Sequence, residues 1–238
     1  MQNGAFFDAL FKDFWSNIDR KRLLTDEHSM FGDASAFDWL IDTVKPTSII
    51  EIGSWKGHSA NYMADGCKRN KLQTKIVCVD TFLGGPEHWL LPGMIEKLYR
   101  VNGMPTIIDR FLGNVIARGN EGIIFPLTLD SSSAAQVMQH LGLKADLIFV
   151  DAGHEYNAVC SDIMRYQPML AEGGVMWGDD YQDKQVADAV HDCATKLGVP
   201  VVVFPKTRKW IYLNNTLLAH GLPAGTDLRS SFEGWVHP

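Results

Sequence analysis

Ser48-Ile-Ile-Glu-Ile-Gly-Ser-Trp-Lys-Gly-His-Ser-Ala60 is the stretch that decides the fold, because it passes from a strand to a glycine-containing turn and then to a helix. The isoleucines of residues 48–52 are typical of a strand that is covered on both faces. Gly53 and Gly57 allow a turn and a close approach of the backbone. The pattern predicts a nucleotide-type pocket at the carboxyl end of a parallel strand.

The spacing of this turn indicates which nucleotide it suits. It reads E-x-G-x-x-x-G, which differs from the G-x-G-x-x-G that binds a pyrophosphate at a helix N-terminus. A carboxylate at Glu51 suits an ammonium group or another cationic ligand and repels a diphosphate. The spacing therefore disfavours NAD, although the glycines could also serve only the packing of the loop.

Length and composition limit the possible classes of protein. The chain has 238 residues, of which 46% are hydrophobic and 21% charged, so we expect one globular domain spanning residues 1–238. Its net charge of -6 gives no reason to expect nucleic acid or a membrane as partner. No secretory signal opens the chain, and four widely spaced cysteines indicate buried thiols in a reducing compartment, so we expect a cytoplasmic protein.

Strand and helix patterns alternate along most of the chain and predict an α/β fold. We expect a Rossmann-like, doubly wound, mostly parallel sheet that ends in a C-terminal antiparallel hairpin. Further strands are expected at 75–82 and 123–129 and from Ala145 and Gly173, the hairpin at 200–205 and 209–213, and helices at 57–68, 134–141 and 183–197.

Three segments do not follow this alternation of strands and helices. Residues 1–45 are expected to form a helical cover, in which an aromatic stripe predicts one helix over 6–18 that packs on the sheet or, alternatively, contributes to a homo-oligomer contact. Residues 83–122, with a helix at 106–118, are expected to form a lid or substrate-binding insertion in which His88 and Trp89 stand out. The tail from Asn214 onward is expected to be irregular.

An acidic residue closes the second predicted strand. Asp80 is positioned to accept hydrogen bonds from both ribose hydroxyls of a bound nucleoside. Many nucleotide-binding α/β proteins share this feature, so it indicates a ribose without naming the nucleotide. A cap at the strand end is the alternative.

Three further carboxylates follow the next two predicted strands. Asp151 ends one strand, and Asp179 and Asp180 end its expected neighbour, so all three should converge at one edge of the sheet. Unpaired carboxylates at short range raise one another's proton affinity, and a divalent cation relieves this repulsion. Oxygen ligands without cysteine or paired histidine favour Mg²⁺ over Zn²⁺, with Mn²⁺ or Ca²⁺ as possible substitutes. The alternatives are a helix cap and a surface salt bridge.

Several motifs together resemble one enzyme family. They are Glu51-x-Gly, Asp80, Asp-x-x-His-x-Tyr at 151–156, and Leu170-x-x-Gly-Gly-x-x-x-x-Asp-Asp180. The set resembles class I S-adenosylmethionine-dependent methyltransferases. It is most similar to the metal-dependent O-methyltransferases that act on sugar hydroxyls, the macrocin, mycinamicin and novobiocin type.

This resemblance implies a Mg²⁺-dependent O-methyltransferase that acts on a hydroxyl of a small molecule, with a sugar or vicinal diol as acceptor. The metal ligands would be Asp151, Asp179 and Asp180. His154 would act with Asp151 in catalysis as the group that takes the hydroxyl proton, or else it would bind substrate without proton transfer. The residues implied to bind the cofactor are Glu51, Gly53, Ser54, Gly57, Asp80, Thr81, Asp130 and Ser131.

Three other classes of protein stay open from the residues alone. An NAD(P)-dependent oxidoreductase is disfavoured by Glu51, by the altered glycine spacing and by the terminal hairpin. A metal-dependent hydrolase could use Asp151, His154 and Asp179, but it leaves the glycine turn unexplained. A non-catalytic nucleotide-binding protein predicts weak metal affinity.

Overall fold

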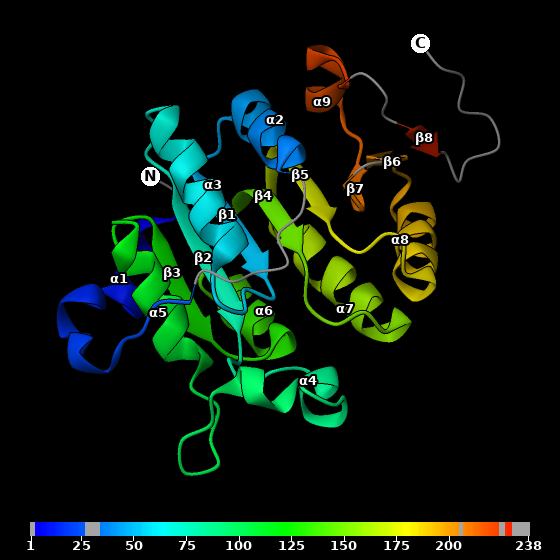
Figure 1. The fold of residues 1–238 in the computed structure, drawn as a ribbon. Coiled ribbons are helices and arrows are strands. Elements are labelled where there is room, and N and C mark those ends of the chain that lie inside the picture. Colours follow the sequence, from blue (N-terminus) through cyan, green and yellow to red (C-terminus); the bar gives the residue numbers. More distant parts are fainter. Residues whose placement is uncertain (1–2, 27–33, 205–206, 224–226, 230–238) are drawn as a thin grey trace.

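The computed structural model describes residues 3–26, 34–204, 207–223 and 227–229, which form one eight-stranded sheet with helices on both faces (Figure 1). The strand order is β3-β2-β1-β4-β5-β7-β6-β8. Strands β1 to β5 run parallel, whereas β7, β6 and β8 are added antiparallel. The strands are β1 Ser48–Ile52, β2 Lys75–Asp80, β3 Ile124–Thr128, β4 Ala145–Val150, β5 Leu170–Gly178, β6 Val201–Phe204, β7 Lys209–Tyr212 and β8 Asp227–Arg229.

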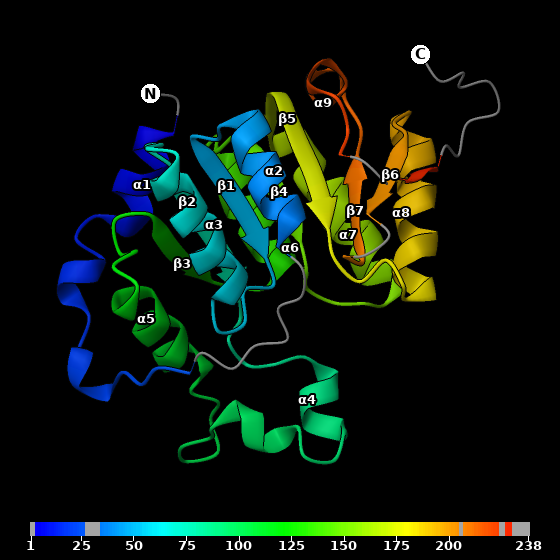
Figure 2. The ribbon, with the colours of Figure 1, turned by 45° about the horizontal axis from the view of Figure 1, so that its top comes forward.

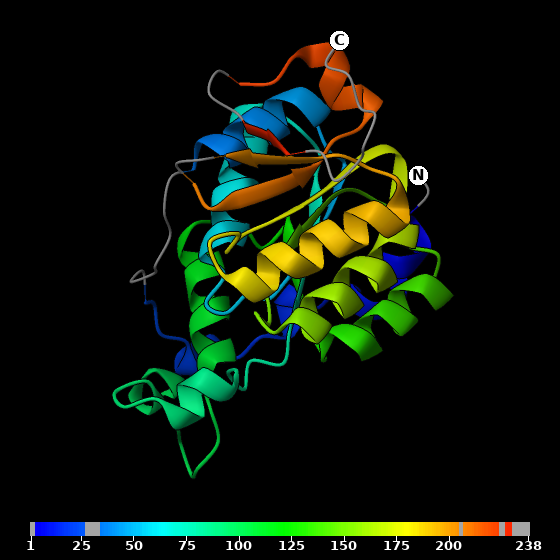
Figure 3. The same cartoon turned by 90° about the vertical axis from the view of Figure 1, so that its right-hand side faces the viewer.

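Apart from α4, which projects from the sheet, the helices form two layers with the sheet between them (Figures 2 and 3). Buried side chains of α2, α3, α5 and α9 form the core on one face, and those of α1, α6, α7 and α8 form the core on the other. The predicted Rossmann-like α/β fold is thus confirmed. The helices are α1 Gly4–Phe11, α2 Ser35–Val44, α3 His58–Arg69, α4 Pro86–Leu90, α5 Ile107–Ala117, α6 Ser131–His140, α7 Tyr156–Tyr166, α8 Lys184–Leu197 and α9 Asn215–His220.

The strand order places the switch point of the sheet between β1 and β4. The chain moves outward from β1 to β2 and β3, then returns to pair β4 with the other side of β1. All five residues of β1 are buried, as expected for a strand covered on both faces. Ligands of open α/β sheets bind at such a point, beyond the carboxyl ends of the strands.

The predicted N-terminal helix is shorter than the aromatic stripe suggested. Helix α1 ends at Phe11, and Asp13 adopts a left-handed conformation with φ 56° before a short 3₁₀ turn at Trp15–Asn17. The stripe still packs on the sheet, because the ring centroids of Phe7 and Phe11 each lie 5.3 Å from that of Phe125 on β3. Residues 1–2 and 27–33 of the expected cover lie outside the described residues.

The expected insertion divides into two parts. Residues 83–105 leave the sheet and contain α4 and a 3₁₀ turn at Ile95–Leu98. Helix α5 instead belongs to the helical layer, since Ile107, Phe111 and Val115 are fully buried, and it connects β2 to β3 as an ordinary crossover. The projecting part is therefore residues 83–105, which is shorter than the expected 83–122, because Ile107–Ala117 form the crossover helix α5.

The C-terminal hairpin forms as predicted, with Val202 paired to Ile211. The expectation of an irregular tail is wrong for two segments. Helix α9 begins where the Asn214 side chain accepts a hydrogen bond from the Leu217 amide, and β8 pairs with β6 at the edge of the sheet. The tail beyond Arg229 lies outside the described residues. Among the described helices, none is long and apolar enough to span a membrane.

Candidate active site

The glycine turn between β1 and α3 brings two strand ends into contact. Gly53 has φ 87°, and a Cβ at this position would lie 2.1 Å from the carbonyl oxygen of Asp151 at the end of β4. Gly57 has φ 75° and directly precedes α3, against the ring of Phe111. Both conformations favour glycine, and at Gly53 the approach of the two backbones requires it.

Glu51 faces the interior and not an open pocket. Its carboxylate is fully buried and accepts hydrogen bonds from the Ser59 hydroxyl of α3 and the Cys78 thiol of β2. Burial raises its pKa above the ordinary value. The side chain therefore connects β1, β2 and α3 beneath the turn through its hydrogen bonds. The sequence had suggested that it would face the ligand pocket.

The predicted ribose carboxylate closes β2 beside the same turn. Asp80 accepts hydrogen bonds from the backbone amides of Trp55 and Phe82, each at 2.7 Å, and burial raises its pKa. Each carboxylate oxygen keeps a further lone pair. The next residue, Thr81, accepts a hydrogen bond from the Leu83 amide. Nearby in the chain, the hydroxyl oxygen of Ser54 is buried without a partner among the described residues.

The turn after β3 contains the two residues expected near the adenine. Asp130 caps α6 by accepting a hydrogen bond from the Ser133 amide at 2.9 Å, and its hydrogen bonds with Ser133 lower its pKa. The carbonyl of Ser131 accepts a hydrogen bond from the Tyr166 hydroxyl. Capping accounts for Asp130 locally, while its side chain stays exposed at the carboxyl edge of the sheet.

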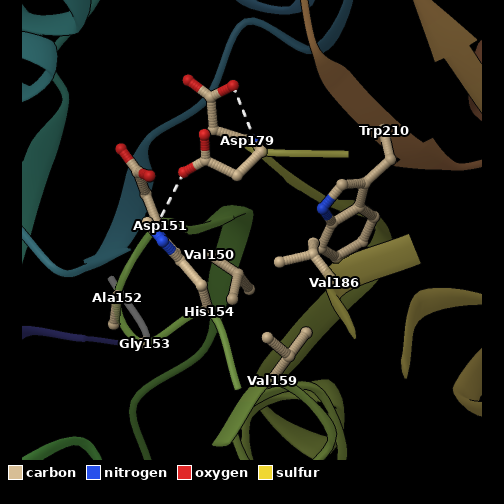
Figure 4. A pocket seen from close by; sticks show the side chains of 10 residues that line it. Val150, Asp151, Ala152, Gly153, His154, Val159, Asp179, Val186 and Trp210 are labelled. Atoms are coloured by element: carbon tan, nitrogen blue, oxygen red, sulfur yellow. Dashed lines mark hydrogen bonds and ion pairs between the residues drawn. The ribbon is translucent and has the colours of Figure 1, made fainter. Parts of the chain in front are cut away.

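Beyond β4 and β5, the side chains of Asp151, His154 and Asp179 lie around a small depression (Figure 4). One ligand atom from each of Asp151, His154 and Asp180 lies within 4.8 Å of the other two. Nε2 of His154 lies 2.9 Å from an Asp180 oxygen, and this hydrogen bond raises the pKa of His154 to about 9. Burial, followed by the charges of Asp179 and Asp180, raises the pKa of Asp151 well above its usual range.

Asp179, the third predicted metal ligand, is turned toward Lys209 of the hairpin. One of its oxygens lies 2.8 Å from Nζ of Lys209 on β7, and the other accepts a hydrogen bond from the Asp180 amide. Arg208, half exposed, lies 3.3 Å from the other oxygen of Asp180. The structure thus brings Asp151, His154 and Asp180 together and leaves Asp179 outside the group.

Sequence reasoning missed the contribution of the hairpin. Trp210, like Lys209, reaches the site because β7 inserts between β5 and β6, next to Gly178. Trp210 is fully buried, and its indole N–H has no partner among the described residues. Together with Val150, Val159 and Val186 it lines the same small depression as the acidic side chains.

The projecting segment contacts the glycine turn. The ring of His88 stacks on Trp55 of the turn, with centroids 4.1 Å apart. Lys56 of the turn forms a buried ion pair with Asp26, to which Tyr99 of the segment also donates a hydrogen bond. Trp89, by contrast, is 42% exposed, and its indole donates to the carbonyl of Leu83 within its own segment. His88 therefore holds the segment against the turn that was expected to bind the cofactor.

Comparison with known proteins agrees with this arrangement. Residues 50–181, more than half of the chain, match the family described as "Methyltransferase domain". The chain belongs to this family, and the predicted class of S-adenosylmethionine-dependent methyltransferase is confirmed by the match together with the fold. The match sets aside the oxidoreductase and hydrolase alternatives. A search of curated proteins gave no match.

Solved structures share the fold at low sequence identity. The calicheamicin methyltransferase CalS11 aligns with a TM-score of 0.55 and 18% identity over 77% of this chain and 78% of that chain. The O-methyltransferase NovP gives 0.53 and 16% over 76% and 78%. An O-methyltransferase from Bacillus cereus in complex with SAH gives 0.55 and 11% over 88% and 96%. At these identities the comparison concerns the fold alone.

Proposed function

We propose that this protein transfers a methyl group from S-adenosylmethionine to a hydroxyl of a small molecule, with a sugar or vicinal diol as the acceptor, and that it requires Mg²⁺ or Mn²⁺. The observation that carries the proposal is the convergence of Asp151, His154 and Asp180 at the carboxyl edge of the sheet, across the switch point from the glycine turn. Two proteins that share the fold support this choice of acceptor. CalS11 is named a TDP-rhamnose 3'-O-methyltransferase, and NovP is named an O-methyltransferase.

The cofactor fits the cradle around the glycine turn. Ser54 offers a buried hydroxyl without a partner in the described chain, and Asp80 keeps lone pairs for the two ribose hydroxyls. A side chain at Gly53 would clash with the Asp151 carbonyl, where the chain after β1 passes close to the end of β4. We assign the adenine side to Asp130 and Ser131, and the methionine side to the turn from Gly53 to Gly57.

The donor set beside the cradle fits a hard divalent cation. Asp151 makes no side-chain hydrogen bond or ion pair within the described residues, and a carboxylate oxygen of Asp180 lies within 4.8 Å of one of its own. Carboxylate oxygens are preferred ligands of Mg²⁺. A cation bound by these two carboxylates would lower the pKa of an acceptor hydroxyl and favour its deprotonation.

His154 is the residue of this chain that can take the proton. While it is paired with Asp180 its raised pKa keeps it protonated at neutral pH, so it becomes a base only when that pair opens. The acceptor oxygen then forms a bond to the methyl carbon as the carbon–sulfur bond breaks. The proton remains on the imidazole and later leaves to solvent, to which His154 is exposed.

The test is a calorimetric titration of S-adenosylhomocysteine and then Mg²⁺ into the wild type and the Asp180→Asn variant. We expect both proteins to bind the nucleoside, and the variant to bind Mg²⁺ at least about tenfold more weakly. Asp188→Asn, at an exposed position on α8, is the control and should bind Mg²⁺ like the wild type. No nucleoside binding by the folded wild type would refute the cofactor assignment, and no Mg²⁺ binding would refute the metal requirement.

An acceptor screen follows from the same proposal. Sugars and catechols with neighbouring hydroxyls, each paired with an analogue that lacks one of the two hydroxyls, would be tested for methyl transfer from labelled S-adenosylmethionine. We expect transfer only to acceptors with a free hydroxyl beside a second oxygen. The four free cysteines, three of them buried, support a reducing location such as the cytoplasm.

A further inference from the structure

Lys209 enters the site from the hairpin and ends in a buried position. Its side chain is 2% exposed, and Nζ lies 2.8 Å from an oxygen of Asp179 and 5.3 Å from the ring centroid of Phe37. Nζ also donates to the carbonyl of Thr207 at 3.4 Å. Removing an ammonium group from water to this extent requires a counter-ion, and Asp179 is its only carboxylate partner among the described residues.

Both oxygens of Asp179 are engaged in this arrangement. One pairs with Lys209, and the other accepts the Asp180 amide at 2.8 Å. The contacts of Asp180 are of a different kind, because its partners His154 and Arg208 are 53% and 47% exposed and can turn toward solvent. A cation can therefore replace the partners of Asp180 at a small desolvation penalty, whereas replacing Lys209 would leave a buried ammonium group unpaired.

The charges of the site agree with this division. With Asp179 paired to Lys209, two carboxylates stay open to a cation. Asp151 makes no ion pair within the described residues, and the partners of Asp180, His154 and Arg208, are about half exposed and can be displaced. Asp179 also lies outside the group of side chains whose ligand atoms come within 4.8 Å of one another.

We propose that Lys209 withholds Asp179 from the metal, so that Asp151 and Asp180 are the carboxylates that bind the cation and Lys209 sets the affinity of the site. The inference rests on the proposed metal site, and it departs from the three-carboxylate set that the sequence motifs implied. Lys209 acts as a positioning residue, since it orients Asp179 and fixes the charge that the cation meets.

The experiment compares Mg²⁺ titrations, at saturating S-adenosylhomocysteine, of the wild type, Asp180→Asn, Lys209→Met and the double variant Asp179→Asn, Lys209→Met. The double variant removes both charges of the pair while keeping side chains of similar size. We expect it to bind Mg²⁺ within about threefold of the wild type, and Asp180→Asn to bind at least about tenfold more weakly. Lys209→Met frees a third carboxylate and should bind about tenfold more tightly. Double-variant affinity as low as that of Asp180→Asn would overturn the proposal.

A second measurement uses the stability of the folded protein. Thermal unfolding of the wild type and the double variant is followed with and without saturating Mg²⁺, and we expect Mg²⁺ to raise the melting temperature of both by the same amount. A clearly smaller rise in the double variant would show that Asp179 contributes to cation binding and would contradict the inference. If the wild type binds no Mg²⁺, the metal requirement fails by itself. In that case, gain of binding in Lys209→Met supports the role of Lys209, and its absence overturns it.

Discussion

Nε2 of His154, on the turn after β4, lies 2.9 Å from Oδ2 of Asp180, at the end of β5, and this contact joins the only imidazole of the acidic group to a carboxylate. The hydrogen bond raises the pKa of His154 from 6.5 to about 9. The contact therefore decides the protonation state of the proposed base before substrate arrives.

We predict that Asp180→Asn lowers the pKa of His154 from about 9 toward 6.5, measured by NMR titration of the imidazole in metal-free protein. Asparagine is chosen because residue 180 has φ 55°, which asparagine tolerates. Because the folded-state pKa is raised, the pair stabilises the fold fully below pH 6.5 and loses this contribution as the pH rises through about 9. An unchanged titration in the variant would mean that Asp180 is not the partner.

The close approach at Gly53 gives a second prediction. Gly53→Ala places a methyl group 2.1 Å from the Asp151 carbonyl and forces an unfavourable φ, so we expect a loss of more than about 3 kcal/mol in the free energy of unfolding, together with loss of nucleoside binding. The control is Gly119→Ala, which has φ 62° but no atom within 4 Å of the added Cβ. It should lose only about 1 kcal/mol in urea unfolding. Equal losses would show that backbone conformation alone explains the glycine at 53.

Much of the site could be predicted because it depends on strand ends. The apolar runs before Asp80, Asp151 and Asp179 identify buried parallel strands, and their carboxyl ends must meet at one edge of the sheet. The direction of each side chain was not predictable in this way. Glu51 lies under the turn because Ser59 and Cys78 are close in space, a relationship that the sequence order does not contain.

The contribution of β7 shows the same limit. Its antiparallel pairing with β6 follows from the short connection, but its insertion next to β5 is a property of the whole sheet. Only that insertion brings Lys209 to Asp179, which lies 30 residues earlier in the chain. Likewise, α1 ends before the left-handed residue Asp13, and no residue of the aromatic stripe marks this break.

A third prediction concerns the attachment of the projecting segment. The side chain of Lys56 is 6% exposed, and it pairs with Asp26 while Tyr99 of the segment donates to the same carboxylate. Lys56→Met removes the buried cation from beside the Asp26 carboxylate, so we expect a loss of about 3 kcal/mol in unfolding free energy and faster proteolysis within residues 83–105. The matched control is Lys184→Met, which breaks an exposed pair on α8 and should change stability by less than about 0.5 kcal/mol. Similar losses in both variants would contradict the anchoring role.

The last prediction uses a buried carboxyl away from the acidic group. Asp162, on the inner face of α7, is 3% exposed, and burial raises its pKa to about 6. A raised folded-state pKa means that the acid stabilises the fold fully below its unfolded pKa, about 3.9, and loses this contribution as the pH rises through about 6. Asp162→Asn is neutral at every pH and should avoid that loss.

We therefore expect Asp162→Asn to raise the free energy of unfolding on the order of 2 kcal/mol at pH 8 and to leave it nearly unchanged at pH 4. Urea unfolding at the two pH values measures the difference, with the exposed Asp188→Asn as the control, which should stay within about 0.5 kcal/mol of the wild type at both. A variant that is less stable than the wild type at pH 8 would show that ionised Asp162 is satisfied by hydrogen bonds, and that its burial in α7 carries no penalty at neutral pH.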